Sequence, residues 1–172
     1  MRELADEPRI RRFLRALGAF VGDETVVYLT GGATAVLEGW RGTTVDVDIR
    51  IEPESDALLR ALARLKDELA INVELASPAD FIPLPEGWKD RSPFVVREGS
   101  VTFRHFDLTA QALAKLERGH DRDLADVRAM LDRGLVDRAA LQVAFAEIEG
   151  ELYRFPAIDP GAFRRRVEEH VG

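Results

Sequence analysis

The segment 43–53 contains a strict alternation of apolar and charged side chains from Val45 to Glu52, and this pattern constrains the fold more than any other feature of the sequence. The apolar positions are Val45, Val47, Ile49 and Ile51, and the charged positions are Asp46, Asp48, Arg50 and Glu52. Successive side chains of a strand point to opposite faces, so the pattern predicts a strand with one face in the core and the other at the surface. Pro53 is expected to end it.

The rest of the chain predicts helices and strands in mixed order. Amphipathic helices are expected over 8–20 and 55–70, and a short helix is expected over 33–40. Strands are expected over 26–30 and 71–76, an irregular Pro-rich loop over 77–93, and a hairpin over 94–106 that turns at Gly99-Ser100. From residue 109 onward the patterns are helical. The sequence therefore predicts an α+β core with an N-terminal helix over residues 1–107, followed by a C-terminal helical region over 108–172.

Composition excludes several classes of function. The chain of 172 residues has no Cys, which excludes a disulfide framework, a thiolate metal site and a cysteine nucleophile. It contains no apolar run of membrane-spanning length and no apolar core of a signal peptide at its start, so a cytoplasmic protein without membrane contact is expected. The net charge of −7 disfavours non-specific binding of nucleic acid.

The sequence Asp46-Val47-Asp48 places two carboxylates on the same face of the predicted strand. Carboxylates this close repel each other unless a cation lies between them. Mg²⁺ favours one or two carboxylates together with substrate phosphates, which makes the pair a candidate metal site. The alternative is a solvent-exposed strand face that is acidic without a ligand.

A second candidate lies upstream, where Thr30, Gly31 and Gly32 follow a predicted strand and precede a short helix. Two glycines allow backbone N–H groups to approach a phosphate closely, although a tight turn without a ligand is the commoner use of Gly-Gly. Glu74 has the strand parity of Asn72, opposite to that of Val73, so it is a candidate third carboxylate on the same sheet.

The segment LTGGATAVLEGWRGTTVDVDI resembles the signature of the nucleotidyltransferase superfamily, which has the DNA polymerase β-like fold. That signature is Gly-Gly or Gly-Ser, a spacer, and an acidic-hydrophobic-acidic-hydrophobic strand. The resemblance implies a mixed sheet with flanking helices. It also implies transfer of a nucleotidyl group from a nucleoside triphosphate to an acceptor hydroxyl. Asp46 and Asp48 would ligate Mg²⁺ or Mn²⁺, Glu74 would complete the site, and Thr30, Gly31 and Gly32 would hold the triphosphate.

A later segment, LAKLERGHDRDLADVRAML, resembles the helical part of small bacterial AbiEii-type nucleotidyltransferase-like proteins. The resemblance implies that Lys115 contacts a phosphate and that Asp123 helps to bind the nucleotide, with Arg122 and Asp126 in the same motif. It further implies a toxin of a toxin–antitoxin pair, with an antitoxin partner and tRNA or protein as acceptor. A solvated Lys115, and a charge network of Arg122, Asp123 and Asp126 at a helix N-terminus, are the structural alternatives.

The leading hypothesis is therefore a metal-dependent nucleotidyltransferase. The alternative is a catalytically silent binding or regulatory module that keeps the fold, because fold alone does not establish chemistry. His105, His120 and His170 have no metal-ligand spacing and receive no catalytic role in either hypothesis.

Overall fold

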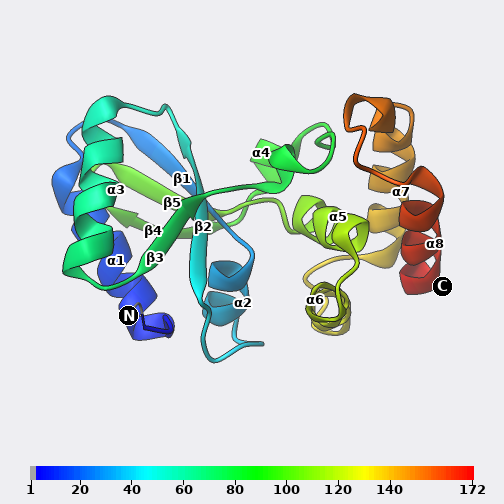
Figure 1. Cartoon of the computed structure of the whole chain (residues 1–172), viewed down its shortest axis with the longest axis horizontal. Helices are drawn as coiled ribbons and strands as arrows, with labels where there is room; N and C mark the ends of the chain where they lie inside the picture. The colour runs from blue at the N-terminus through cyan, green and yellow to red at the C-terminus, as the bar shows by residue number, and fades with distance from the viewer. Residues whose placement is uncertain (1–2) are drawn as a thin grey trace. The chain divides into compact units, whose positions relative to one another are not determined.

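The computed structural model describes residues 3–172, and the chain divides into two compact units. Unit 1 consists of Met1–Ser77 and Pro93–His105, and unit 2 consists of Pro78–Ser92 and Phe106–Gly172. Unit 1 holds the sheet and is coloured from blue to green, and unit 2 is helical and coloured from green to red (Figure 1). Each unit is described separately below.

Unit 1 is built on a five-stranded mixed sheet in the order β3-β2-β1-β5-β4. The strands are β1 (Thr25–Thr30), β2 (Asp46–Glu52), β3 (Asn72–Leu75), β4 (Phe94–Glu98) and β5 (Val101–His105). β1 pairs antiparallel with β2 and parallel with β5, β2 pairs parallel with β3, and β4 and β5 form the expected hairpin. The predicted α+β class with a mixed sheet is confirmed.

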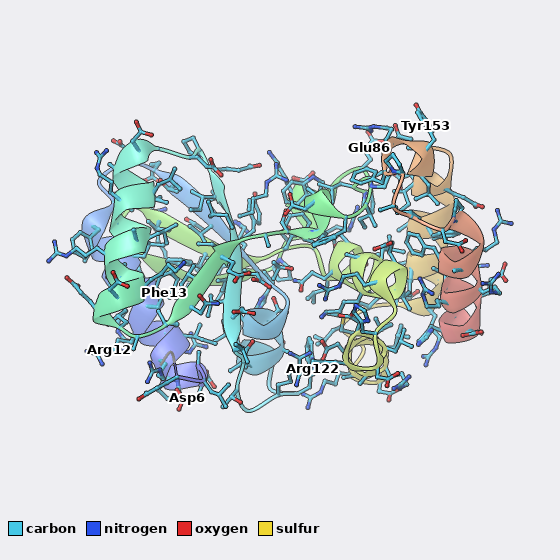
Figure 2. All side chains as sticks on the ribbon, in the orientation of Figure 1. Asp6, Arg12, Phe13, Glu86, Arg122 and Tyr153 are labelled. Carbon is cyan, nitrogen blue, oxygen red and sulfur yellow. The ribbon has the colours of Figure 1, made fainter. Side chains whose placement is uncertain are left out.

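Three helices belong to unit 1: α1 (Glu7–Phe20), α2 (Gly32–Glu38) and α3 (Asp56–Glu68). Asp6 caps α1 by accepting from the Arg9 N–H at 3.0 Å, and Ser55 caps α3 in the same way. α1 and α3 pack beside each other and share one hydrophobic core with the sheet (Figure 1). Phe13 of α1 is buried in that core, whereas Arg12 is exposed and points away from it (Figure 2).

The alternation of β2 is reflected in its burial, since Val47, Ile49 and Ile51 are all in the core. Val45 is an exception to the prediction: its side chain is 55% exposed. The ladder with β3 begins only at Asp46, so Val45 precedes the regular strand and is not held to its pleat. β1 is buried along most of its length, as its apolar run predicts for a central strand.

Unit 2 contains five α-helices and two short 3₁₀ helices in the part of the chain that the structure describes: η1 (Pro78–Asp80), α4 (Trp88–Arg91), α5 (Leu108–Arg118), α6 (Asp121–Asp132), α7 (Arg138–Glu149), η2 (Leu152–Arg154) and α8 (Pro160–Val171). The segment 77–93 is therefore not wholly irregular, as predicted, because η1 and α4 interrupt it. Trp88 stacks on Phe106 with 4.3 Å between ring centroids, which anchors α4.

The helices α5, α7 and α8 pack together around apolar side chains such as Phe145 and Phe163, whose rings lie 4.9 Å apart edge to face. Arg166 of α8 donates to the carbonyl oxygens of Leu116 and Glu117, which are among the unpaired carbonyls at the end of α5. No helix formed by residues 3–172 has the length and apolar character needed to cross a membrane.

Candidate active site

The two carboxylates of β2 lie on one face of the sheet, as predicted. Asp46 and Asp48 are half-buried, and Val47 between them is fully buried on the opposite face. The two side chains therefore project together from a strand whose other face is locked in the core. This arrangement fixes their spacing without any ligand.

The neighbouring strand brings a third carboxylate alongside. In the parallel ladder, Asp46 is opposite Asn72 and Asp48 is opposite Glu74. The Asn72 side-chain amide donates a short hydrogen bond to Asp46 Oδ1 and a second one, of 3.3 Å, to Glu74 Oε1. Since one amide contacts both carboxylates, Glu74 shares the face of Asp46 and Asp48, and its predicted parity is confirmed.

The glycine turn lies directly against this acidic strand. Gly31 has a φ of +61°, and a Cβ at this position would lie 3.0 Å from Asp48 Oδ2. A Cβ on Gly32 would lie 1.9 Å from Thr44 Oγ1, so Gly32 and Thr44 pack too closely for a side chain at position 32. Thr30 is opposite Asp48 in the β1–β2 ladder. The structure thus brings Thr30, Gly31 and Gly32 next to the carboxylate pair.

Thr44 and Asn72 are two further members of the site, and neither was assigned a role from the sequence. Thr44 is buried against Gly32, and its hydroxyl donates to the Asp46 carbonyl at 2.9 Å. It therefore joins the glycine turn to the start of the acidic strand. Asn72 could have been found from its strand parity, because it lies two residues before Glu74 and on the same face.

The donor set fits a hard divalent cation. Asp46 and Asp48 offer carboxylate oxygens, the ligands that Mg²⁺ prefers, and the glycine beside Asp48 leaves space that any side chain would fill. Across residues 3–172, no three or more His, Cys, Asp or Glu side chains are arranged to hold a metal ion by themselves. A metal held by this pair would take its remaining ligands from substrate phosphates and water.

Lys115 and Asp123 lie in unit 2, where they form a buried charge cluster with Asp126 and Arg118. The Lys115 ammonium donates to Asp126 Oδ2 at 2.8 Å and lies 3.8 Å from Asp123 Oδ1. Arg118 donates to the same Asp123 oxygen at 2.6 Å. Lys115 is only 6% exposed, so the reading of a solvated lysine is wrong.

The structure also differs from the alternative in which Arg122, Asp123 and Asp126 form a charge network at a helix N-terminus. Asp126 is 3% exposed and faces Lys115, whereas Arg122 is exposed on α6 (Figure 2). Within the described residues, Asp123 Oδ2 is a buried oxygen with no hydrogen-bond partner. Burial also raises the pKa of Glu117, with nearby Arg166 and Arg118 acting in the opposite direction.

A mixed sheet that carries an acidic pair on one strand, with a Gly-Gly turn packed against that pair, is the arrangement of the nucleotidyltransferase superfamily. Residues 10–155 match the model of the family described as "Nucleotidyltransferase of unknown function (DUF6036)", and the chain belongs to this family. The predicted superfamily is thereby confirmed. Neither the curated proteins nor the solved structures include a match to this chain.

Proposed function

We propose that the protein is a metal-dependent nucleotidyltransferase that transfers a nucleotidyl group from a nucleoside triphosphate to an acceptor hydroxyl. The observation that carries the proposal is the contact between Gly31 and Asp48, because it places a backbone able to approach phosphate beside a carboxylate pair suited to Mg²⁺. Membership of a nucleotidyltransferase family supports the same chemistry.

Asp46 and Asp48 would hold Mg²⁺ or Mn²⁺, which would supply positive charge to the phosphates of the bound triphosphate. The backbone at Thr30, Gly31 and Gly32 would hold those phosphates. Because the opposite face of β2 is buried, Asp46 and Asp48 would keep their positions while negative charge shifts among the substrate phosphates during the reaction. Such preorganisation is the main contribution a protein makes to phosphoryl-type transfer.

In the proposed reaction, the acceptor oxygen forms a bond to the α-phosphorus and the bond from that phosphorus to the bridging oxygen of the β-phosphate breaks. Pyrophosphate leaves with the bonding electron pair. The proton of the acceptor hydroxyl passes to Glu74, which is exposed and shares the face of Asp46 and Asp48, or to water. Asn72 orients Glu74 for this role by donating to it at 3.3 Å.

The proposal extends to the AbiEii-like motif of unit 2. Lys115 would contact a substrate phosphate and Asp123 would help to bind the nucleotide; the buried pairing of Lys115 with Asp126 supports a fixed position for the ammonium group. By the same resemblance we infer a toxin of a toxin–antitoxin pair, acting on RNA or protein and controlled by an antitoxin. The support for this part of the proposal is the resemblance of the segment LAKLERGHDRDLADVRAML to those proteins.

The test is an incubation of the protein with each α-labelled nucleoside triphosphate, Mg²⁺ and bulk tRNA. Asp46→Asn/Asp48→Asn should abolish label transfer and pyrophosphate release. The matched control is Glu54→Gln/Asp67→Asn, which removes two exposed carboxylates elsewhere in unit 1 and should keep full activity.

Two results would count against the proposal. Equal activity in the wild type and the Asp46/Asp48 variant would show that another site acts. Calorimetry in which the wild type binds neither Mg²⁺ nor any of the four nucleotides would favour the catalytically silent module instead.

A further inference from the structure

His105 is the last residue of β5, and both of its ring nitrogens contact the helix that follows the glycine turn. It is 2% exposed. Nδ1 lies 3.0 Å from the hydroxyl of Thr34, and Nε2 lies 3.0 Å from Glu38 Oε1. Thr34 and Glu38 are four residues apart on α2, so one side chain spans the first and last turns of this helix.

Both ring nitrogens can form hydrogen bonds when the ring is neutral. Nε2–H then donates to the Glu38 carboxylate, and Nδ1 accepts from the Thr34 hydroxyl. In the charged ring, Nδ1–H would donate to the Thr34 hydroxyl, which donates to the Leu29 carbonyl at 3.2 Å. Burial lowers the pKa of His105, Glu38 on α2 raises it, and Arg11 on α1 lowers it further; these two are the charged groups that act on the ring.

α2 depends on such contacts because it has only seven residues. An isolated helix of this length does not hold its conformation in water. Its position matters to the acidic pair: Gly32 is its first residue and packs on Thr44, and Gly31 just before it lies against Asp48. A shift of α2 along its axis would move both glycines relative to the carboxylates.

We infer that His105 is a positioning residue, which clamps α2 at Thr34 and Glu38 and so sets the Gly31–Gly32 turn against Asp48 for nucleotide binding. This inference rests on the proposed function of the turn. Among residues 3–172, the His105 ring bonds to Thr34 and Glu38 of α2 and not to Asp46 or Asp48, so it acts through α2. It therefore differs from a residue that binds the phosphates directly.

The experiment measures binding of each Mg²⁺–nucleoside triphosphate by calorimetry. His105→Ala removes both contacts and should weaken binding at least tenfold. His105→Asn offers an amide near the place of Nδ1 and His105→Gln offers one near the place of Nε2, so each should restore part of the affinity. Val101→Ala is the matched control, since it removes buried side-chain atoms from the other end of β5 and should leave binding within twofold of the wild type.

A pH series gives a readout that a purely structural role would not move. Wild-type affinity should change as His105 titrates below its ordinary pKa, and this component should vanish in His105→Gln. The inference is overturned if Val101→Ala weakens binding as much as His105→Ala, or if the alanine, asparagine and glutamine variants all bind like the wild type. If His105→Ala does not fold, nucleotide binding by His105→Gln and His105→Asn is compared with that of the wild type and Val101→Ala on the same criteria.

Failure of the proposed function would be recognised separately. If the wild type binds no nucleotide, the proposal for the turn fails, and amide hydrogen exchange then tests the clamp alone. The amides of Ala35 and Val36 in α2 should exchange faster in His105→Ala than in Val101→Ala. Equal exchange in the two variants would overturn the clamp as well.

Discussion

Replacing Lys115 with Met should destabilise unit 2 severely, because Lys115 neutralises buried carboxylates. The change keeps the length of the side chain and removes its charge. The ion pair of 2.8 Å between Lys115 and Asp126 is then lost, and Asp123 keeps its ion pair with Arg118. Removing one partner of a buried ion pair costs about 3–5 kcal/mol, because an uncompensated charge stays in the interior.

Asp123 is the second carboxylate near Lys115, and it determines where in this range the loss of unfolding free energy should fall. Lys115 lies 3.8 Å from Asp123 as well, and Asp123 already has one oxygen without a hydrogen-bond partner among the described residues. Removal of the Lys115 ammonium thus affects two buried carboxylates, which places the expected loss of unfolding free energy near the upper end of that range. By contrast, Arg118→Met should cost only about 1 kcal/mol, since Arg118 is 43% exposed and solvent screens its charge.

Urea unfolding measures these differences, and Trp88 reports on unit 2 because it stacks on Phe106 there. In a Trp40→Phe background it is the sole tryptophan. With a urea slope of roughly 1–3 kcal/mol/M, a loss of about 4 kcal/mol lowers the midpoint by more than 1 M.

The double variant Lys115→Met/Asp126→Leu tests the reason for the loss. Replacing both partners of a buried pair by apolar residues is often neutral, so most of the stability should return. A loss below about 1 kcal/mol in Lys115→Met, or no recovery in the double variant, would refute the buried-pair reasoning. Lys115 would then be available for a purely functional role, and loss of nucleotide binding without loss of stability would be its signature.

Gly32→Ala should lower the free energy of unfolding by about 1–3 kcal/mol, as overpacking does, because its Cβ would collide with Thr44; a thermal melt measures this, and an unchanged melting temperature contradicts the packing. His105 should make stability depend on pH. Its pKa is lowered in the folded state, so its contribution is full above about 6.5 and falls with pH down to the folded-state pKa. The difference in unfolding free energy between wild type and His105→Gln should therefore shrink between pH 7 and pH 5, and a constant difference in urea titrations would show that His105 does not titrate there.

The predictable part of the fold is the part set by local periodicity. The alternation of β2, the apolar stripe of α1 and the Ser55 cap of α3 are each written in consecutive residues, and the structure confirms them. Val45 departs from its alternation because pairing with β3 starts one residue later. The short α4 escaped prediction since it is a single turn, held by the stack of Trp88 on Phe106 rather than by an amphipathic pattern.

The candidate site was predictable only in part, for a related reason. The shared face of Asp46 and Asp48 follows from strand parity alone, and so does that of Glu74 once β3 is placed beside β2. The contacts of Gly32 with Thr44 and of His105 with Glu38 join residues distant in sequence. No spacing rule encodes such contacts, because they depend on how the sheet orders its strands.

The discontinuous course of unit 1 determines how the protein can be dissected. The chain passes between the units after Ser77, after Ser92 and after His105, so no single cut separates them. A fragment ending at residue 107 would keep Phe81 and Glu86 but lose their partners Arg118 and Glu147. Independent expression of the sheet unit requires excision of 78–92 and a new linker from Ser77 to Pro93. Unit 2 is better obtained by joining Ser92 to Phe106, because the His105 N–H donates to the Pro93 carbonyl at 2.8 Å and the ends of the removed hairpin therefore lie close together.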